Sequence, residues 1–289
     1  MRIGSEAHKE LFCQSFMESH LKYEPENLPW PKLDEATLAR LRGIPFWEEA
    51  RDTERNAGVM VSAFAQTVSD PLLREAIALQ GVEETRHSRM IDFLINHYGV
   101  TIPVRPPKGI SHNIERAFIN FGYGECFDSF FAFGLFGLAH QSGLFPEQFF
   151  TIFESIVDEE ARHMVFFVNW IAYHQVQQGR GARVFRSTYS LWHYLAAIRR
   201  RLNSFMSGNK STDGSFTATG AGAVTKDLTL EKFLSICLQE NERRMSVYDE
   251  RLLRPQLMPS LAEAALRTVK LVPGRQARTK EETAELAGL

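Results

Sequence analysis

The sequence predicts an all-α protein. Apolar residues recur every three or four positions along most of the chain, which is the period of a helix with one buried face. Pro and Gly separate these stretches, and the alternation typical of strands is nearly absent. The chain has 289 residues, 44% hydrophobic and 24% charged, which is ordinary for a globular protein with one large domain or two small ones.

Residues 1–45 are expected to form an extended N-terminal arm. Short helical patterns there alternate with Pro25, Pro29, Pro31 and Pro45. Because Pro lacks a backbone N–H and restricts the preceding residue, these positions interrupt any long helix. The arm is therefore predicted to precede the main helical unit.

Four long helices are predicted within residues 46–175, with boundaries set by caps, Pro and Gly. Their expected ranges are about 46–64, 70–97, 113–141 and 146–175. Asp70 followed by Pro71 is typical of a helix start. Gly122 and Gly124 could break the third helix.

Two additional helices are expected in residues 176–272, at about 184–205 and 228–253, packed on the four long helices. The stretch 207–225 between them is rich in Gly, Ser and Thr and is expected to be a mobile linker. Residues 273–289 are polar and are expected to form a flexible tail.

Charge and cysteine content narrow the classes of partner and compartment. A net charge of −2 argues against a nucleic-acid partner, and the basic run at residues 199–201 is interpreted as a solvated helix end. Three well-separated cysteines, Cys13, Cys126 and Cys237, suggest a reducing compartment. The sequence shows neither the apolar segment of a signal peptide nor a transmembrane segment. We therefore expect a cytoplasmic protein.

The most informative feature is the pattern Glu-Glu-x-Arg-His, which occurs at residues 83–87 and again at 159–163. A single Glu-x-x-His is a weak signal, but here both copies share further residues and lie on apolar helical stripes. In each copy the second Glu and the His are three residues apart, so they project from one face of a helix. These pairs are Glu84 with His87 and Glu160 with His163.

Two further carboxylates occupy inward positions. Glu54 lies on the first helix, where Ala50, Ala57 and Val61 mark the buried stripe, and Glu125 is the only glutamate of the third helix between residues 117 and 146. Buried carboxylates are costly unless cations or metals pair with them. The six candidate metal ligands are Glu54, Glu84, His87, Glu125, Glu160 and His163. The alternative, ion-paired helix surfaces, is disfavoured because both repeats coincide with apolar stripes.

This order of ligands resembles the ferritin-like di-iron and di-manganese carboxylate superfamily, where one Glu from each of two helices joins Glu-x-x-His from each of the other two. The resemblance covers about residues 46–175 and implies a ferritin-like four-helix bundle with a long central crossover. Two iron ions would be the usual occupants, with manganese as an alternative at one or both positions.

A closer likeness is to the cyanobacterial aldehyde-deformylating oxygenases. It is carried by Glu125-Cys126-Phe127, by residues 157–160 leading to His163 and Phe166, and by Glu54-Arg55-Asn56-Ala57. The resemblance implies that Glu84 and Glu160 bridge the metals. It also implies that Glu54 and Glu125 are terminal ligands and that each His binds one metal.

Residues adjacent to these ligands have two interpretations each. Glu83 and Glu159 either hydrogen-bond a ligand His, as such acids do in related enzymes, or face solvent. Asp128 is either an extra or supporting acid or an exposed one. Arg86 and Arg162 are expected to be surface or helix-pairing residues.

The Phe-rich run at residues 127–136 fills a core or lines a substrate pocket beside the metals. The second interpretation is favoured by the neighbouring ligand, and it makes Phe127, Phe131 and Gly134 the pocket candidates. His193 is the one histidine outside the four helices considered as an extra ligand, although a satisfied or exposed histidine is the preferred interpretation.

Together these observations predict an enzyme, a non-haem di-iron oxygenase or oxidase that uses O₂ to oxidise an apolar small molecule of fatty-acyl, aldehyde, quinone or secondary-metabolite type. A ferredoxin or reductase is expected as external electron donor, because the sequence has no Rossmann or flavin fingerprint. A homodimer is one of the oligomeric states left open. Two alternatives remain: a ferritin-like iron-binding and iron-oxidising protein without an organic substrate, and a di-manganese catalase-like enzyme.

Overall fold

The computed structural model describes residues 1–103, 105–106, 108–206 and 229–271, and every regular element within those ranges is helical. The all-α prediction is therefore confirmed for this part of the chain. None of its helices is both long and apolar enough to cross a membrane. The predicted linker at 207–225 and tail at 273–289 lie outside the described residues.

The N-terminal arm is largely helical rather than extended. It contains α1 (Glu6–Glu18), the 3₁₀ helix η1 (Pro25–Asn27) and α2 (Glu35–Arg42). The side chain of Ser5 caps α1 and that of Asp34 caps α2, each accepting a bond from a backbone N–H of the first turn. Helix α1 packs on α6 and α4, and its Phe12 and Phe16 are buried in the main core. The expectation of an extended arm was wrong, because buried aromatics hold α1 against the other helices.

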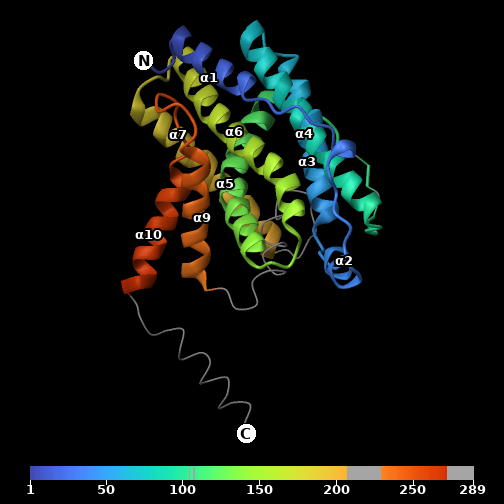
Figure 1. Ribbon diagram of the computed structural model, residues 1–289. Coiled ribbons are helices and arrows are strands. Elements are labelled where there is room, and N and C mark those ends of the chain that lie inside the picture. The colour runs from blue at the N-terminus through green and yellow to red at the C-terminus, as the bar shows by residue number, and fades with distance from the viewer. Residues whose placement is uncertain (104, 107, 207–228, 272–289) are drawn as a thin grey trace.

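Four long helices form the centre of the molecule (Figure 1). They are α3 (Trp47–Ala65), α4 (Pro71–His97), α5 (Ile114–Gln141) and α6 (Glu147–Gln177). Helix α3 packs on α4 and α5 packs on α6, while contacts of α3 with α5 and of α4 with α6 join the two pairs. The connection between α4 and α5 is the longest of the three, as predicted. Helix α5 continues through Gly122, where an added Cβ would lie 2.1 Å from the Phe167 ring, so this Gly permits close packing on α6.

Close approach of α3 and α4 depends on two glycines. A Cβ at Gly58 would lie 2.5 Å from Thr85 Oγ1, and one at Gly81 would lie 2.4 Å from Ser62 Oγ. Any larger side chain would force the two helices apart, because real Cβ atoms do not approach so closely. Gly58 lies one turn beyond Glu54, so this contact sets how near α3 brings its carboxylate to α4.

Three described helices follow α6, not the expected two. They are α7 (Arg183–Met206), α9 (Leu230–Met245) and α10 (Leu257–Leu271). The last of the predicted helices, at about 228–253, corresponds to α9, which ends earlier, at Met245, and is followed by a turn. Arg254 closes this turn by donating hydrogen bonds to the backbone carbonyls of Met245 and Tyr248. Helices α7, α9 and α10 all contact α5, and α10 also packs on α9.

Candidate metal centre

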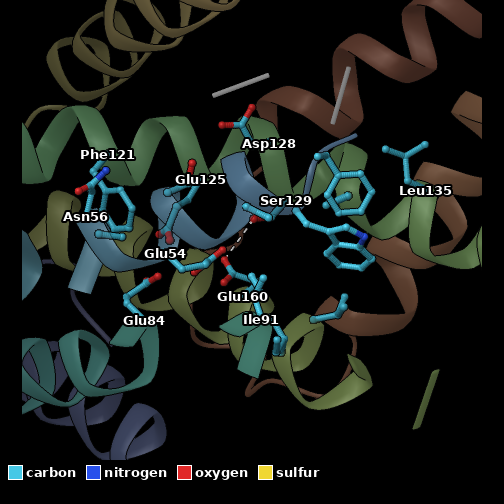
Figure 2. Close-up of a pocket in the computed structure, with 18 of the residues that line it drawn as sticks. Glu54, Asn56, Glu84, Ile91, Phe121, Glu125, Asp128, Ser129, Leu135 and Glu160 are labelled. Atoms are coloured by element: carbon cyan, nitrogen blue, oxygen red, sulfur yellow. Dashed lines mark hydrogen bonds between the residues drawn. The ribbon is translucent and has the colours of Figure 1, made fainter. Parts of the chain in front are cut away.

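The six predicted ligands lie together between α3, α4, α5 and α6. They form two groups, and within each group one ligand atom per residue lies within 4.8 Å of the others. The groups are Glu54, Glu84, His87 and Glu160, and Glu84, Glu125, Glu160 and His163. Figure 2 shows the four carboxylates turned toward one another. Glu84 and Glu160 belong to both groups, so the structure offers two adjacent four-residue positions for cations.

Helical spacing produces this convergence. On α4 and on α6, a Glu and a His three residues apart project from the same inner face, while α3 and α5 supply one Glu each. The side chains of both His are completely buried, and that of Glu84 is 1% exposed. Side chains of the other three carboxylates retain 10–21% exposure because they border a cavity.

Both histidines direct Nδ1 toward the carboxylates. His87 Nδ1 lies 3.2 Å from Glu160 Oε1 and 3.4 Å from Glu54 Oε2, and His163 Nδ1 lies 3.1 Å from Glu84 Oε1. Neither buried Nδ1 makes a hydrogen bond in the described part of the chain. A buried imidazole nitrogen without a hydrogen bond, surrounded by carboxylate oxygens, suits a metal ion.

The other ring nitrogen of each His is bound reciprocally across the two helices. His87 Nε2 of α4 lies 2.8 Å from Glu159 Oε2 of α6, and His163 Nε2 of α6 lies 2.9 Å from Glu83 Oε2 of α4. Both Glu side chains are completely buried. Of the two interpretations of these acids, hydrogen bonding to a candidate ligand His is the observed one. A neutral His that donates from Nε2 keeps the Nδ1 lone pair available to a metal.

The arginines of the two repeats are buried and pair the helices. Arg86 of α4 binds Glu159 of α6, and Arg162 of α6 binds Glu83 of α4 at 2.5 Å. The exposed fractions of the two arginines are only 7% and 4%. The helix-pairing interpretation is confirmed, and the surface interpretation is wrong.

Two residues that follow α1 also reach these acids and were missed by sequence reasoning. His20 Nδ1 contacts Glu83 Oε1, and the Tyr23 hydroxyl donates to Glu159 Oε2 at 2.9 Å. No sequence signal could have found them, because they lie some sixty and 136 positions from their partners. His20, Glu83 and Glu159 are themselves close enough to hold a cation, but the buried arginines already balance both carboxylates there.

Gln80 and Ser129 donate to the candidate ligands and were also missed as site residues. Gln80 Nε2 lies 3.3 Å from Glu84 Oε1 and 3.4 Å from Glu125 Oε2, and Ser129 Oγ lies 3.4 Å from Glu160 Oε2. Their helical spacing from the ligands could have identified both residues in the sequence. Gln80 lies one turn before Glu84 on the same stripe, and Ser129 lies one turn after Glu125.

Asp128 and His193 do not join the centre. Asp128 points away from the four carboxylates (Figure 2), and its Oδ2 lies 3.1 Å from Arg201 Nε of α7. The prediction that it adds to or supports the ligands is corrected, because the turn of α5 directs it toward α7. The ring of His193 stacks on Tyr123, with Nδ1 3.3 Å from Asn120 Oδ1, outside both ligand groups.

Burial and, after it, the crowding of like charges shift the pKa values of the candidate ligands. Desolvation raises the pKa of Glu54 to about 8 and that of Glu125 well above its ordinary value. Desolvation by itself would lower the pKa of His163. However, the charge of the nearby Glu84 carboxylate and the hydrogen bond to Glu83 raise it to about 10. Cations entering the centre would therefore displace protons.

An apolar cavity of about 700 Å³ adjoins the carboxylates. Glu54, Glu84, Glu125 and Glu160 form one part of its wall. Aromatic residues form much of the rest: Phe46, Trp47, Phe121, Phe133, Phe136, Phe145, Phe149, Phe150 and Phe153. The volume is typical of sites that enclose small organic ligands.

The three predicted pocket residues do not line this cavity. Phe127 packs against Phe131, which in turn stacks on α9, and a Cβ at Gly134 would lie 2.2 Å from Cys237 Sγ of α9. Each helical residue is rotated by about 100° from the last, so a residue two positions after Glu125 points to the opposite side. The prediction for Phe127, Phe131 and Gly134 was wrong for this reason, although α5 does supply other phenylalanines to the cavity.

Comparison with protein-family models found no match, and neither curated proteins nor solved structures matched the chain. The interpretation of the centre therefore rests on its residues and geometry.

Substitution of a shared ligand should affect both metal positions. Glu84→Ala is expected to lose most of the metal that the wild-type protein binds, because Glu84 belongs to both groups. Glu125→Ala should remove about one equivalent, because it belongs to one group only. Elemental analysis after anaerobic loading measures both. Full retention of metal in Glu84→Ala would contradict the assignment, and His193→Ala, which should leave the stoichiometry unchanged, is the matched control.

Removal of a buried acid should destabilise the metal-free protein strongly. Glu159→Ala leaves buried Arg86 without its carboxylate, and breaking such a buried pair costs about 3–5 kcal/mol. Urea unfolding of metal-free variants measures the change. Glu26→Ala is the control, since its pairing with Arg89, also of α4, is exposed and its loss should have a much smaller effect. Equal losses of stability in the two variants would contradict this account of the buried pairs.

Metal affinity should rise with pH between about pH 6 and 8. Below its pKa of about 8, Glu54 of the metal-free protein holds a proton, which a metal must displace. Raising the pH removes that competition, so binding tightens and releases fewer protons from this carboxyl. Calorimetric titration with Mn²⁺ in buffers of different ionisation enthalpy measures both quantities. Affinity independent of pH would contradict the prediction.

Proposed function

We propose that the protein is a di-metal oxidoreductase of the ferritin-like type that uses O₂ to oxidise an apolar small molecule. One observation carries this proposal. Two four-residue ligand groups share Glu84 and Glu160, and their carboxylates open onto an apolar cavity. This arrangement would place cations and an organic substrate side by side.

The donor set fits two divalent ions. Four carboxylates carry a formal charge of −4, which two such ions cancel, and mixed carboxylate and imidazole donors suit iron or manganese. Glu84 and Glu160 would hold both ions, Glu54 and Glu125 one each, and each His would bind one through Nδ1. Two bound iron ions would supply electrons for the reduction of O₂.

The residues around the ligands would keep the centre in one geometry. Glu83 and Glu159 fix the ring orientation of the two histidines, and Arg162 and Arg86 hold those acids in place. Gln80 would orient Glu84 and Glu125 through its amide. Such support is needed because ligand positions must be held closely while the charge of the centre changes.

The cavity would bind and desolvate the substrate. Its aromatic walls favour an aliphatic or aromatic compound and exclude water from the centre. Fatty acids, fatty aldehydes and quinones of moderate size fit this chemistry. A separate electron donor, a ferredoxin or a reductase, would restore the reduced metals.

The cavity also separates this proposal from iron storage. A protein that only oxidises and sequesters iron gains nothing from a large apolar cavity beside its ligands. A di-manganese catalase-like enzyme acts on a small polar peroxide and gains nothing from it either. Both alternatives are outcomes of the experiment below.

Oxygen uptake by the iron-loaded protein tests the proposal. Protein loaded anaerobically with Fe²⁺ should bind about two ions per chain and consume O₂ with a transient visible absorption. An aliphatic aldehyde or fatty acid of medium length should hasten the decay of that absorption and yield an oxidised product. Growth of a mineral core without effect of any organic compound would favour storage. Peroxide disproportionation by the manganese-loaded protein alone would favour the catalase-like alternative.

Narrowing the cavity should reduce substrate oxidation without loss of metal. Ala132 lines the cavity on α5, so Ala132→Phe should reduce the substrate-dependent rate by about tenfold or more while leaving two ions bound. Phe131→Leu, on the α9 side of the same helix, is the matched control and should preserve the rate. Product analysis and elemental analysis on the same samples measure the two quantities. Equal rates for Ala132→Phe and the control would contradict the assignment of the cavity.

A further inference from the structure

Helix α7 carries a row of large apolar side chains on its outer face. In the part of the chain that the structure describes, these side chains are mostly exposed: Val184 74%, Phe185 65%, Leu191 47%, Trp192 72% and Leu195 53%. The inner face of the same helix is buried on α5 through Tyr194 and Ala197. Figure 1 shows α7 running behind α5. The exposure is therefore a property of one face and not of a frayed helix.

The exposed residues form one stripe. Val184, Leu191 and Leu195 follow one another at intervals of seven and four residues, and Phe185, Trp192 and Leu195 at intervals of seven and three. The five side chains therefore share one face of the helix over about three turns. Other exposed apolar residues of the described chain, such as Val82 on α4 and Val247 in the turn after α9, lie on other elements. Single exposed apolar residues need no explanation, but a contiguous stripe that contains Trp and Phe indicates a binding surface.

The charged residues of α7 are all arginines. The helix contains Arg183, Arg186, Arg199, Arg200 and Arg201 and neither Asp nor Glu. Arg183 and Arg186 lie in the first turn, where the helix dipole disfavours positive charge. Stability of the helix therefore does not account for them. Arg183 and Arg199 are exposed at the two ends of the apolar stripe.

We propose that α7 binds the surface of an anionic lipid bilayer. A helix with Trp, Phe and Leu on one face and arginines around it lies in the interface, with its apolar face at the boundary of headgroups and acyl chains. Trp192 and Phe185 would insert at that depth, as aromatic rings do at membrane interfaces. Arg183 and Arg199 would bind lipid phosphates at either end of the stripe.

The C-terminal end of α7 borders the cavity of the candidate centre. Arg200 and Arg201, which follow the exposed Arg199, line that cavity. The loop segment 108–111 lines it too, and Ile110 of this segment is 57% exposed. A bilayer on α7 would thus lie beside a wall of the cavity. Resting on the proposed function, this placement identifies the substrate as an acyl-chain compound taken from the bilayer.

A second copy of the chain is a poorer occupant of this face. Pairing α7 with α7 about a two-fold axis would bring the basic ends of two helices together, and α7 has no carboxylate to balance them. Like charges placed together across an interface oppose association. Anionic phosphates complement the same arginines. The charge of α7 therefore favours lipid over self-association.

Vesicle binding by the full chain tests the proposal. Wild-type protein should sediment with vesicles of phosphatidylglycerol and phosphatidylcholine but not with phosphatidylcholine alone, and added salt should weaken the binding. Brominated lipids should quench the fluorescence of Trp192, which is 72% exposed, since Trp47 and Trp170 are 5% and 3% exposed and Trp30 is half-buried. Trp192→Phe should remove this quenching while sedimentation persists.

Two variants and one control make the test specific. The double variant Trp192→Ser, Leu195→Ser and the double variant Arg183→Glu, Arg199→Glu should each weaken vesicle binding about tenfold or more. Val247→Ser, Leu261→Ser is the matched control, because it removes exposed apolar side chains from elsewhere and should bind as the wild type does. Circular dichroism confirms that each variant keeps its helix content.

Either of two results in these vesicle experiments would overturn the proposal. Absence of wild-type binding to anionic vesicles, or equal binding by the α7 variants, would overturn it. A concentration-dependent dimer that Trp192→Ser, Leu195→Ser abolishes, without vesicle binding, would assign the face to a second copy instead. Binding is measured without iron or O₂, so its outcome is independent of the proposed oxidation. Vesicle binding by a protein that oxidises no acyl compound would leave the lipid surface standing and remove only the proposed substrate.

Discussion

The carboxylates of Glu54, Glu84, Glu125 and Glu160 lie close together between four helices. The rest of the centre depends on how their negative charge is balanced. Isolated buried carboxylates are strongly destabilising. Here desolvation raises the pKa of Glu54 and Glu125, while the histidines become more basic because the carboxylates surround them. The raised pKa values show that the cluster binds protons readily. A pair of divalent ions would provide the same positive charge in place of those protons.

A second set of charged residues holds the two histidines of the centre in place. Glu83 and Glu159 exchange partners across α4 and α6, so that each helix supports the histidine of the other. Arg162 and Arg86 then balance those acids. The repeated pattern Glu-Glu-x-Arg-His is thus one unit used twice, with the first Glu and the Arg holding the imidazole and the second Glu and the His facing the centre. Gly58 and Gly81 bring α3 close enough to add Glu54.

Much of this could be predicted from helical periodicity, because residues three or four apart share a face. That rule placed the four long helices and five of the six candidate ligands, and Glu125 was assigned because it is the only glutamate between residues 117 and 146. It could not place His20 and Tyr23, since contacts between distant segments leave no local pattern. The prediction for Phe127, Phe131 and Gly134 was wrong for another reason: their positions on α5 are rotated away from the face that carries Glu125, and a high content of Phe does not indicate which face is turned to the centre. The turn at Arg254 was missed because its bonds to backbone carbonyls have no sequence signature.

The most direct test of the account is anomalous X-ray scattering from crystals of the iron-loaded protein. The account predicts two iron peaks between α3, α4, α5 and α6, with Glu84 and Glu160 contacting both. His87 Nδ1 should contact one ion and His163 Nδ1 the other. A single ion, or iron bound at His20, Glu83 and Glu159 instead, would contradict it.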